Sequence, residues 1–181
     1  MNNHYLLWAT GEDRPGIVAA LTGVLFNNGC NLEDSSMMRL GSEFGVLLIF
    51  QSKQILPTDR TKRIFSPLEK KWGLSIGLKK ISRRQAQSSS SVQNLFIIRV
   101  HGPDKPGIVH RVTQSLSKFK FNITDLSTHR TTGGKKAGYI LFIEGELSKK
   151  YSLHPLKRSL SKLQKTLRTT ISLQPISPSS F

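Results

Sequence analysis

The sequence Gly-Glu-Asp-Arg-Pro-Gly-Ile-Val at residues 11–18 recurs as Gly-Pro-Asp-Lys-Pro-Gly-Ile-Val at residues 102–109. The same offset of 91 residues aligns the sequence that follows, so that residues 11–34 and 102–125 share 10 identities in 24 positions. Similarity at a fixed offset is the signature of a repeated structural unit. The chain is therefore expected to contain two copies of one module.

Each copy predicts the same order of elements. An apolar run at residues 4–10 indicates a buried strand, and Ile17, Leu21 and Leu25 mark the apolar face of a helix. Two strands joined by a turn, a second helix at residues 59–72 and a last strand follow. This β-α-β-β-α-β order predicts an α+β fold, with two ferredoxin-like sandwiches in tandem.

Composition shifts suggest where the modules end. The first module is expected to span residues 1–82 and the second residues 93–176. The polar, serine-rich residues 83–92 between them are typical of a flexible linker. Residues 177–181 are expected to form a tail.

The repeated Asp-Arg/Lys-Pro-Gly motif joins the first strand to the first helix. Asp13 is expected to cap this helix by accepting the amide of Gly16, with Pro15 in the first turn. The free amides and the dipole at a helix N-terminus can hold a carboxylate. Because glycine lacks a Cβ atom, a ligand could approach the backbone there closely. The alternative is that these residues only cap, start and pack the helix.

A second repeated feature lies where the chain leaves the helix and enters the second strand. It comprises Asn31 with Asp34, and Asn122 with Asp125 in the second copy. An asparagine amide can accept a hydrogen bond from an ammonium and donate one to a carboxylate. Asparagine after a helix is also an ordinary left-handed cap, so both interpretations stay open.

These motifs together resemble the ACT domain, a small-molecule regulatory module, over residues 4–81 and 94–176. Two such modules in one chain resemble the group of transcriptional repressors of the glycine cleavage system. The resemblance implies pairing of sheets edge to edge, with an amino acid bound between the first strand–helix loop and the second strand. The ligand-binding residues that it implies are Gly11, Asp13, Gly16, Ile17, Asn31, Gly102, Asp104, Gly107, Ile108 and Asn122.

The formal net charge of +16 is the compositional outlier. Residues 91–181 carry 15 Lys/Arg and 4 Asp/Glu, and therefore most of this excess. Such a charge favours polyanions or acidic protein surfaces. The third strands lack the aromatic consensus of RNA-recognition modules, and no helix-turn-helix is evident. The basic surface is therefore expected to contact an acidic protein partner and to bind nucleic acid only non-specifically.

Catalytic and metal-binding patterns are not found. The five histidines show no metal-ligand spacing, and no Ser-His-Asp, Walker or GxGxxG signature is present. Cys30 occupies the place of Phe121 in the second copy, which favours a buried apolar role over a nucleophile. We expect no enzyme activity, no cofactor and no membrane association. One cysteine and the absence of a signal-peptide pattern favour the cytoplasm.

The sequence thus predicts a regulatory protein that senses an amino acid, with glycine as the ligand implied by the resemblance. It would control a transcriptional or metabolic partner protein, and it could form a homodimer. One alternative is a basic, non-catalytic adaptor for nucleic-acid backbones. Another is a detached regulatory subunit of an enzyme of amino-acid metabolism.

Overall fold

The computed structural model describes residues 2–56, 58–87, 94–131, 138–148 and 150–176. The chain divides into two compact units, residues 1–89 and 90–181. The elements of the first unit are β1 (Asn3–Glu12), α1 (Ile17–Asn27), β2 (Cys30–Leu40), β3 (Glu43–Ser52), α2 (Thr58–Trp72) and β4 (Ser75–Ile81). A short helix, α3 (Arg83–Ala86), follows. The elements of the second unit are β5 (Leu95–Pro103), α4 (Ile108–Ser117), β6 (Phe121–Thr131), β7 (Gly138–Leu147), α5 (Leu153–Leu167) and β8 (Thr170–Pro175).

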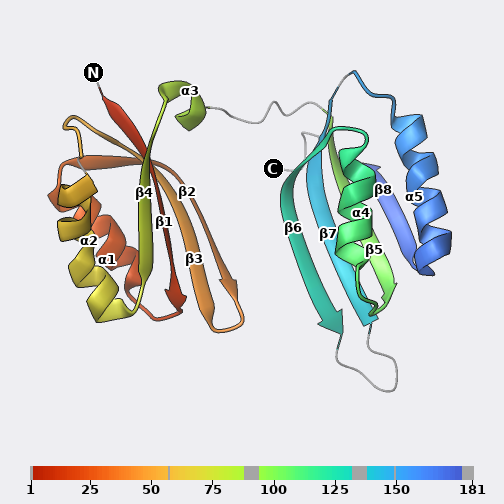
Figure 1. Cartoon of the computed structure of the whole chain (residues 1–181), viewed down its shortest axis with the longest axis horizontal. Helices are drawn as coiled ribbons and strands as arrows, with labels where there is room; N and C mark the ends of the chain where they lie inside the picture. Colours follow the sequence, from red (N-terminus) through yellow and green to blue (C-terminus); the bar gives the residue numbers. More distant parts are fainter. Residues whose placement is uncertain (1, 57, 88–93, 132–137, 149, 177–181) are drawn as a thin grey trace. The chain divides into compact units, whose positions relative to one another are not determined.

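Both units have the predicted ferredoxin-like architecture. The strand order is β2-β3-β1-β4 in the first sheet and β6-β7-β5-β8 in the second, with every neighbouring pair antiparallel. Helices α1 and α2 cover one face of the first sheet, and α4 and α5 cover one face of the second (Figure 1). In each unit, one sheet face is therefore left without a helix.

Buried and exposed side chains alternate along the central strands, and this alternation explains which face of the sheet the helices cover. In β3, Phe44, Val46, Leu48 and Phe50 are buried, whereas Leu47 between them is 50% exposed. Successive side chains of a strand point to opposite faces, so a half-buried sheet needs this period of two.

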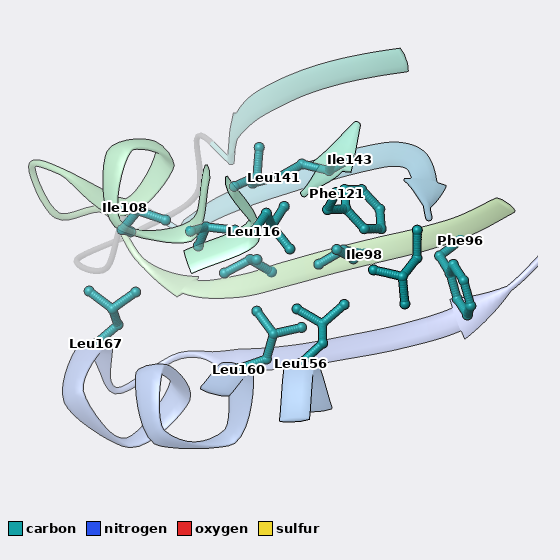
Figure 2. Close-up of a cluster of buried hydrophobic side chains, with 13 residues drawn as sticks. Phe96, Ile98, Ile108, Leu116, Phe121, Leu141, Ile143, Leu156, Leu160 and Leu167 are labelled. Atoms are coloured by element: carbon teal, nitrogen blue, oxygen red, sulfur yellow. The ribbon is translucent and has the colours of Figure 1, made fainter. Parts of the chain in front are cut away.

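The second unit uses the same pattern to build its core. Ile98 of β5 and Leu141 of β7 are fully buried under Leu116, Leu156 and other apolar residues of α4 and α5. Figure 2 shows these helix side chains pointing toward the strands. Each unit therefore has a hydrophobic core of its own.

The register of the first sheet decides which loops are neighbours. At one end, Gly11 of β1 pairs with Phe44 of β3, which pairs with Arg39 of β2. At the other end, His4 pairs with Gln51, which pairs with Asn31. A register shift between Leu32 and Asp34 marks a bulge near this second end.

Three local predictions need correction or comment. Asp13 is not the N-cap of α1, because the helix begins at Ile17 after Gly16 and no side chain caps it. The sequence also predicts a kink or a break at Pro67, because proline disrupts a helix interior, but α2 continues through it. The predicted linker begins with a helical turn, α3, in which Ser82 and Gln85 form a capping box.

The remaining part of the linker, the tail at residues 177–181 and the hairpin loop at residues 132–135 lie outside the described residues. The exact module boundaries stay predictions. Within the described residues, no helix is long and apolar enough to cross a membrane.

We expect Leu48→Ala to lower the free energy of unfolding of the first unit by about 2–5 kcal/mol, because Leu48 is 2% exposed and its loss leaves a cavity. The matched control is Leu47→Ala, one residue along the same strand on the uncovered face. It should cost less than about 1 kcal/mol. Urea denaturation monitored by Trp fluorescence measures both. Equal losses would mean that both faces of this sheet are buried.

Candidate functional site

The turn between β1 and α1 has the same backbone in both units. Gly16 has φ +98° and Gly107 has φ +85°, and both immediately precede the first helical residue. This left-handed conformation is strained for residues with a side chain, so the turn itself explains the two glycines. A Cβ atom on Gly16 would also lie 3.2 Å from the ring of Trp72.

The helix that follows this turn starts without a side-chain cap. In the first unit, the earliest i→i−4 bond of the helix runs from the N–H of Ala20 to the carbonyl of Gly16, at 2.9 Å. Among the described residues, the N–H groups of Val18 and Ala19 have no acceptor. The second unit is equivalent, with Arg111 donating to the carbonyl of Gly107 at 3.0 Å. Open N–H groups and the positive end of the helix dipole can bind an anion.

Each turn also carries an ion pair. The carboxylate of Asp13 lies 3.7 Å from the guanidinium of Arg39, and that of Asp104 lies 2.7 Å from that of Arg130. The aspartates come from the repeated motif, and the arginines come from the ends of β2 and β6. All four side chains are at least partly exposed. A negative and a positive group therefore stand beside open amides at the same end of each sheet.

Sequence reasoning missed the two arginines, although a signal for them was present. Arg39 and Arg130 obey the same offset of 91 residues as the motif itself. They lie beyond the stretch of dense identity, on a strand whose pairing with the rest of the sheet is not visible in the sequence. Asp13 does not cap α1 because the N-cap residue is Gly16, three positions further along the chain.

Several of the predicted ligand-binding residues have a role in the fold. Ile17 and Ile108 are 1% and 2% exposed, so their side chains belong to the two cores. A Cβ atom on Gly11 would lie 2.9 Å from the carbonyl oxygen of Gly73, and one on Gly102 would lie 2.6 Å from the side chain of Thr169. These two glycines let β1 and β5 pass closely by the segment that leads into the last strand of each unit.

The structure does not bring the predicted asparagine to the aspartate within a module. Asn31 lies in register with His4, whereas Asp13 follows the other end of the same strand. Seven residues separate His4 from Gly11, which amounts to about 23 Å along a strand. Asn122 in β6 has the same relation to Asp104. Both asparagines are exposed on edge strands.

A further polar contact, between His4 and Glu33 near the start of β2, has no counterpart in the second copy. The Nδ1 atom of His4 lies 2.9 Å from a carboxylate oxygen of Glu33, the residue at the bulge. His4 is 7% exposed. At the offset of 91 residues, Leu95 stands at the position of His4 and Thr124 at the position of Glu33, so the second unit does not have this contact.

A cavity of about 630 Å³ lies between α2 and β4. Trp8, Phe65 and Leu78 line it together with Lys62 and Glu69. None of the ten predicted ligand-binding residues is among its lining residues. In the described part of the chain, no group of three or more His, Cys, Asp or Glu side chains could hold a metal ion.

Comparison with known proteins gives the family context. Two ACT-domain sequence models match the chain, one over residues 3–79 and the other over residues 96–146. The glycine cleavage system transcriptional repressor of Escherichia coli (strain K12) is 31% identical over 127 residues. That match covers 69% of this chain and 64% of the repressor, so less than two thirds of the relative's own length is represented.

Solved structures agree on the fold over nearly the whole chain. An uncharacterised protein from Galdieria sulphuraria superimposes with a TM-score of 0.80, at 22% identity, over 98% of this chain and 100% of that one. A candidate glycine cleavage system transcriptional repressor superimposes with a TM-score of 0.73, at 22% identity, over 98% and 99%. The likeness to these two structures, at 22% identity, shows a shared fold.

We expect Gly11→Ala to destabilise the first unit by about 1–3 kcal/mol, because the new methyl group would overlap backbone at Gly73. Gly23→Ala is the control. A Cβ atom there meets nothing within 4 Å, and alanine should stabilise the interior of α1 by up to about 1 kcal/mol. Thermal unfolding of both variants without ligand tests this. An unchanged melting temperature for Gly11→Ala would contradict this steric role of Gly11.

Proposed function

The chain belongs to the ACT-domain family, and we propose that it is a non-catalytic regulatory protein in which each ACT module senses an amino acid. One observation carries this proposal: the open helix N-terminus beside an aspartate–arginine pair, which recurs in both modules. A free amino acid presents a carboxylate and an ammonium on adjacent atoms. The site offers partners for both charges.

Binding is proposed to proceed through complementary charges. The ligand carboxylate accepts hydrogen bonds from the N–H groups of Val18 and Ala19, with the helix dipole adding to their attraction. The ligand ammonium faces the carboxylate of Asp13. Arg39 then balances the negative charge of Asp13 and of the ligand. In the second module, Asp104 and Arg130 take these roles.

Glycine is the first ligand to test, because the curated relative is named for the glycine cleavage system. By the same comparison, the regulated partner is proposed to be a transcriptional or metabolic protein in the cytoplasm. Control would pass through protein–protein contact, with the amino acid changing the affinity for that partner.

The edge strand β2 supplies a surface for self-association. All its residues from Asn31 to Leu40 are exposed, and Met37, Met38 and Leu40 are 58%, 61% and 76% exposed. An exposed apolar edge strand is a template for pairing with another strand. We propose that two copies pair antiparallel through β2. A pairing centred on Ser35 would set Asn31 of one copy opposite Arg39 of the other, and would thus join the two separated parts of the predicted site.

Ligand binding is tested by a thermal-shift screen of the twenty amino acids, with glycine first. An amino acid at 100 times its Kd should add about 2.7 kcal/mol to the free energy of unfolding. The double variant Asp13→Asn with Asp104→Asn should abolish this gain while leaving the unliganded protein folded, because both side chains are surface groups. Glu12→Gln removes one charge from the same loop and should keep the response. If no amino acid stabilises the chain, amino-acid sensing is wrong.

Self-association is tested by analytical ultracentrifugation. Met37→Lys with Leu40→Lys should convert a dimer to a monomer without loss of folding, since both side chains are exposed. Phe26→Lys, at an 80% exposed position on α1, is the matched control and should stay dimeric. Because each chain carries +16, added salt should strengthen the dimer by screening the repulsion. A wild-type monomer at all concentrations and salt levels would exclude the pairing.

A further inference from the structure

In the second unit, basic residues gather on the helices, and most acidic residues lie on the opposite face of the sheet. Residues 108–120 and 153–168, which contain α4 and α5, hold eight Lys and Arg residues and no Asp or Glu. These basic residues are Arg111, Lys118, Lys120, Lys157, Arg158, Lys162, Lys165 and Arg168. Glu144 and Glu146 alternate with the buried Ile143 and Leu147 on β7, and Asp125 pairs with Glu144 across the sheet. Three of the four acidic residues therefore lie on the sheet face away from the helices.

The basic face is hollowed between its two helices. A groove of about 370 Å³ has Arg111 of α4 and Lys118, which directly follows α4, on one side and Lys162 of α5 on the other. At its base, the hydroxyl groups of Ser115 and Ser159 are 3.0 Å apart, and Ser115 is 8% exposed. The three cations are exposed, and none joins an ion pair with any residue that the structure describes. We call these five residues the cationic groove.

The first unit shows that the fold does not require these charges. The repeat offset places Ala20 and Asn27 where Arg111 and Lys118 stand. The second helices are aligned by a hydrogen bond that both units make. The side chain of Glu69 accepts a hydrogen bond from the N–H group of Ile76, and Gln164 accepts the equivalent one from Ile171, so the offset here is 95 residues.

By the offset of 95 residues, Pro67 stands at the position of Lys162, and Ile64 at that of Ser159. By the offset of 91 residues, Val24 stands at the position of Ser115. The three cations of the groove thus have no basic counterpart in the first module, although Lys71 stands where Thr166 lines the groove. The difference points to a ligand of the second module.

The chemistry of the face favours phosphates over a protein surface. Protein interfaces depend on a buried centre rich in apolar and aromatic side chains. In the described part of the second unit, Tyr151 is the sole exposed large hydrophobic residue, whereas the first unit has nine. Interfaces with nucleic acid are instead polar and strongly positive.

The spacing of the cations suits a chain of phosphates. Arg111 and Lys118 are two helical turns apart, about 10 Å, and the basic residues of α5, Lys157 to Lys165, extend over about 12 Å. One small anion cannot contact all of them, whereas a nucleic-acid strand presents a charge at every nucleotide.

We propose that the cationic groove and the basic side of α5 bind the sugar–phosphate backbone of nucleic acid, without reading its sequence. Lysine, arginine and hydroxyl groups contact phosphate oxygens and position a strand, but they carry no base information by themselves. The first unit keeps the apolar surfaces, so protein contact and nucleic-acid contact fall on different units of one chain.

The test compares two triple variants of the full chain with the same loss of charge. The groove variant is Arg111→Ala, Lys118→Asn and Lys162→Gln. The control variant is Arg63→Ala, Lys70→Asn and Lys79→Gln, all exposed residues of the first unit. Fluorescence anisotropy measures binding to a labelled DNA duplex of about 20 base pairs and to an unrelated duplex, between about 50 and 200 mM salt. Circular dichroism and thermal melting monitor folding.

We expect the groove variant to bind at least about tenfold more weakly, with a slope of log K against log salt that is less steep by about 2.7, since each lost phosphate contact removes about 0.9. The control variant should change affinity by less than about threefold. Equal losses in both variants would reduce the effect to net charge and overturn the proposal. It is also overturned by absence of binding at low salt, by a thousandfold preference for one duplex, or by stronger binding to polyglutamate than to DNA, which would indicate an acidic protein partner.

Discussion

The left-handed turn at Gly16, and at Gly107 in the second module, is the constraint on which each module depends. It ends β1 and starts α1 within a few residues, so that Ile17 enters the core directly. The first N–H groups of an α-helix have no partner within the helix, and no side chain caps them here. The turn also leaves Asp13 free to pair with Arg39 on a strand that is distant in sequence. Packing, polarity and the proposed binding site therefore follow from one backbone conformation.

Most of the fold could be predicted from the sequence because its signals are local or repeated. The alternation in β3 and the helical spacing of Ile17, Leu21 and Leu25 reflect burial on one side, and all three side chains are buried. The repeat then fixed the order of elements twice over.

The site was harder to predict because it depends on register. Whether Asn31 lies near Asp13 depends on which strands are neighbours and in which direction they run. Those relations are set by tertiary packing, and they placed the asparagine at the opposite end of the sheet. The cap assigned to Asp13 failed for a related reason. The left-handed turn makes Gly16 the residue before the helix, and the local preference of aspartate for capping does not reveal this.

The segregation of charge in the second unit makes it an electric dipole as well as a cation. Its positive pole lies along α4 and α5, and its negative pole lies on the open sheet face near Glu144. A domain with such a dipole experiences a torque in the electric field of a charged surface. It therefore rotates before it makes contact with that surface. The Debye length of about 8 Å at physiological ionic strength confines this rotation to the last stage of approach. The orientation of first contact would then be selected by the field, before any hydrogen bond forms.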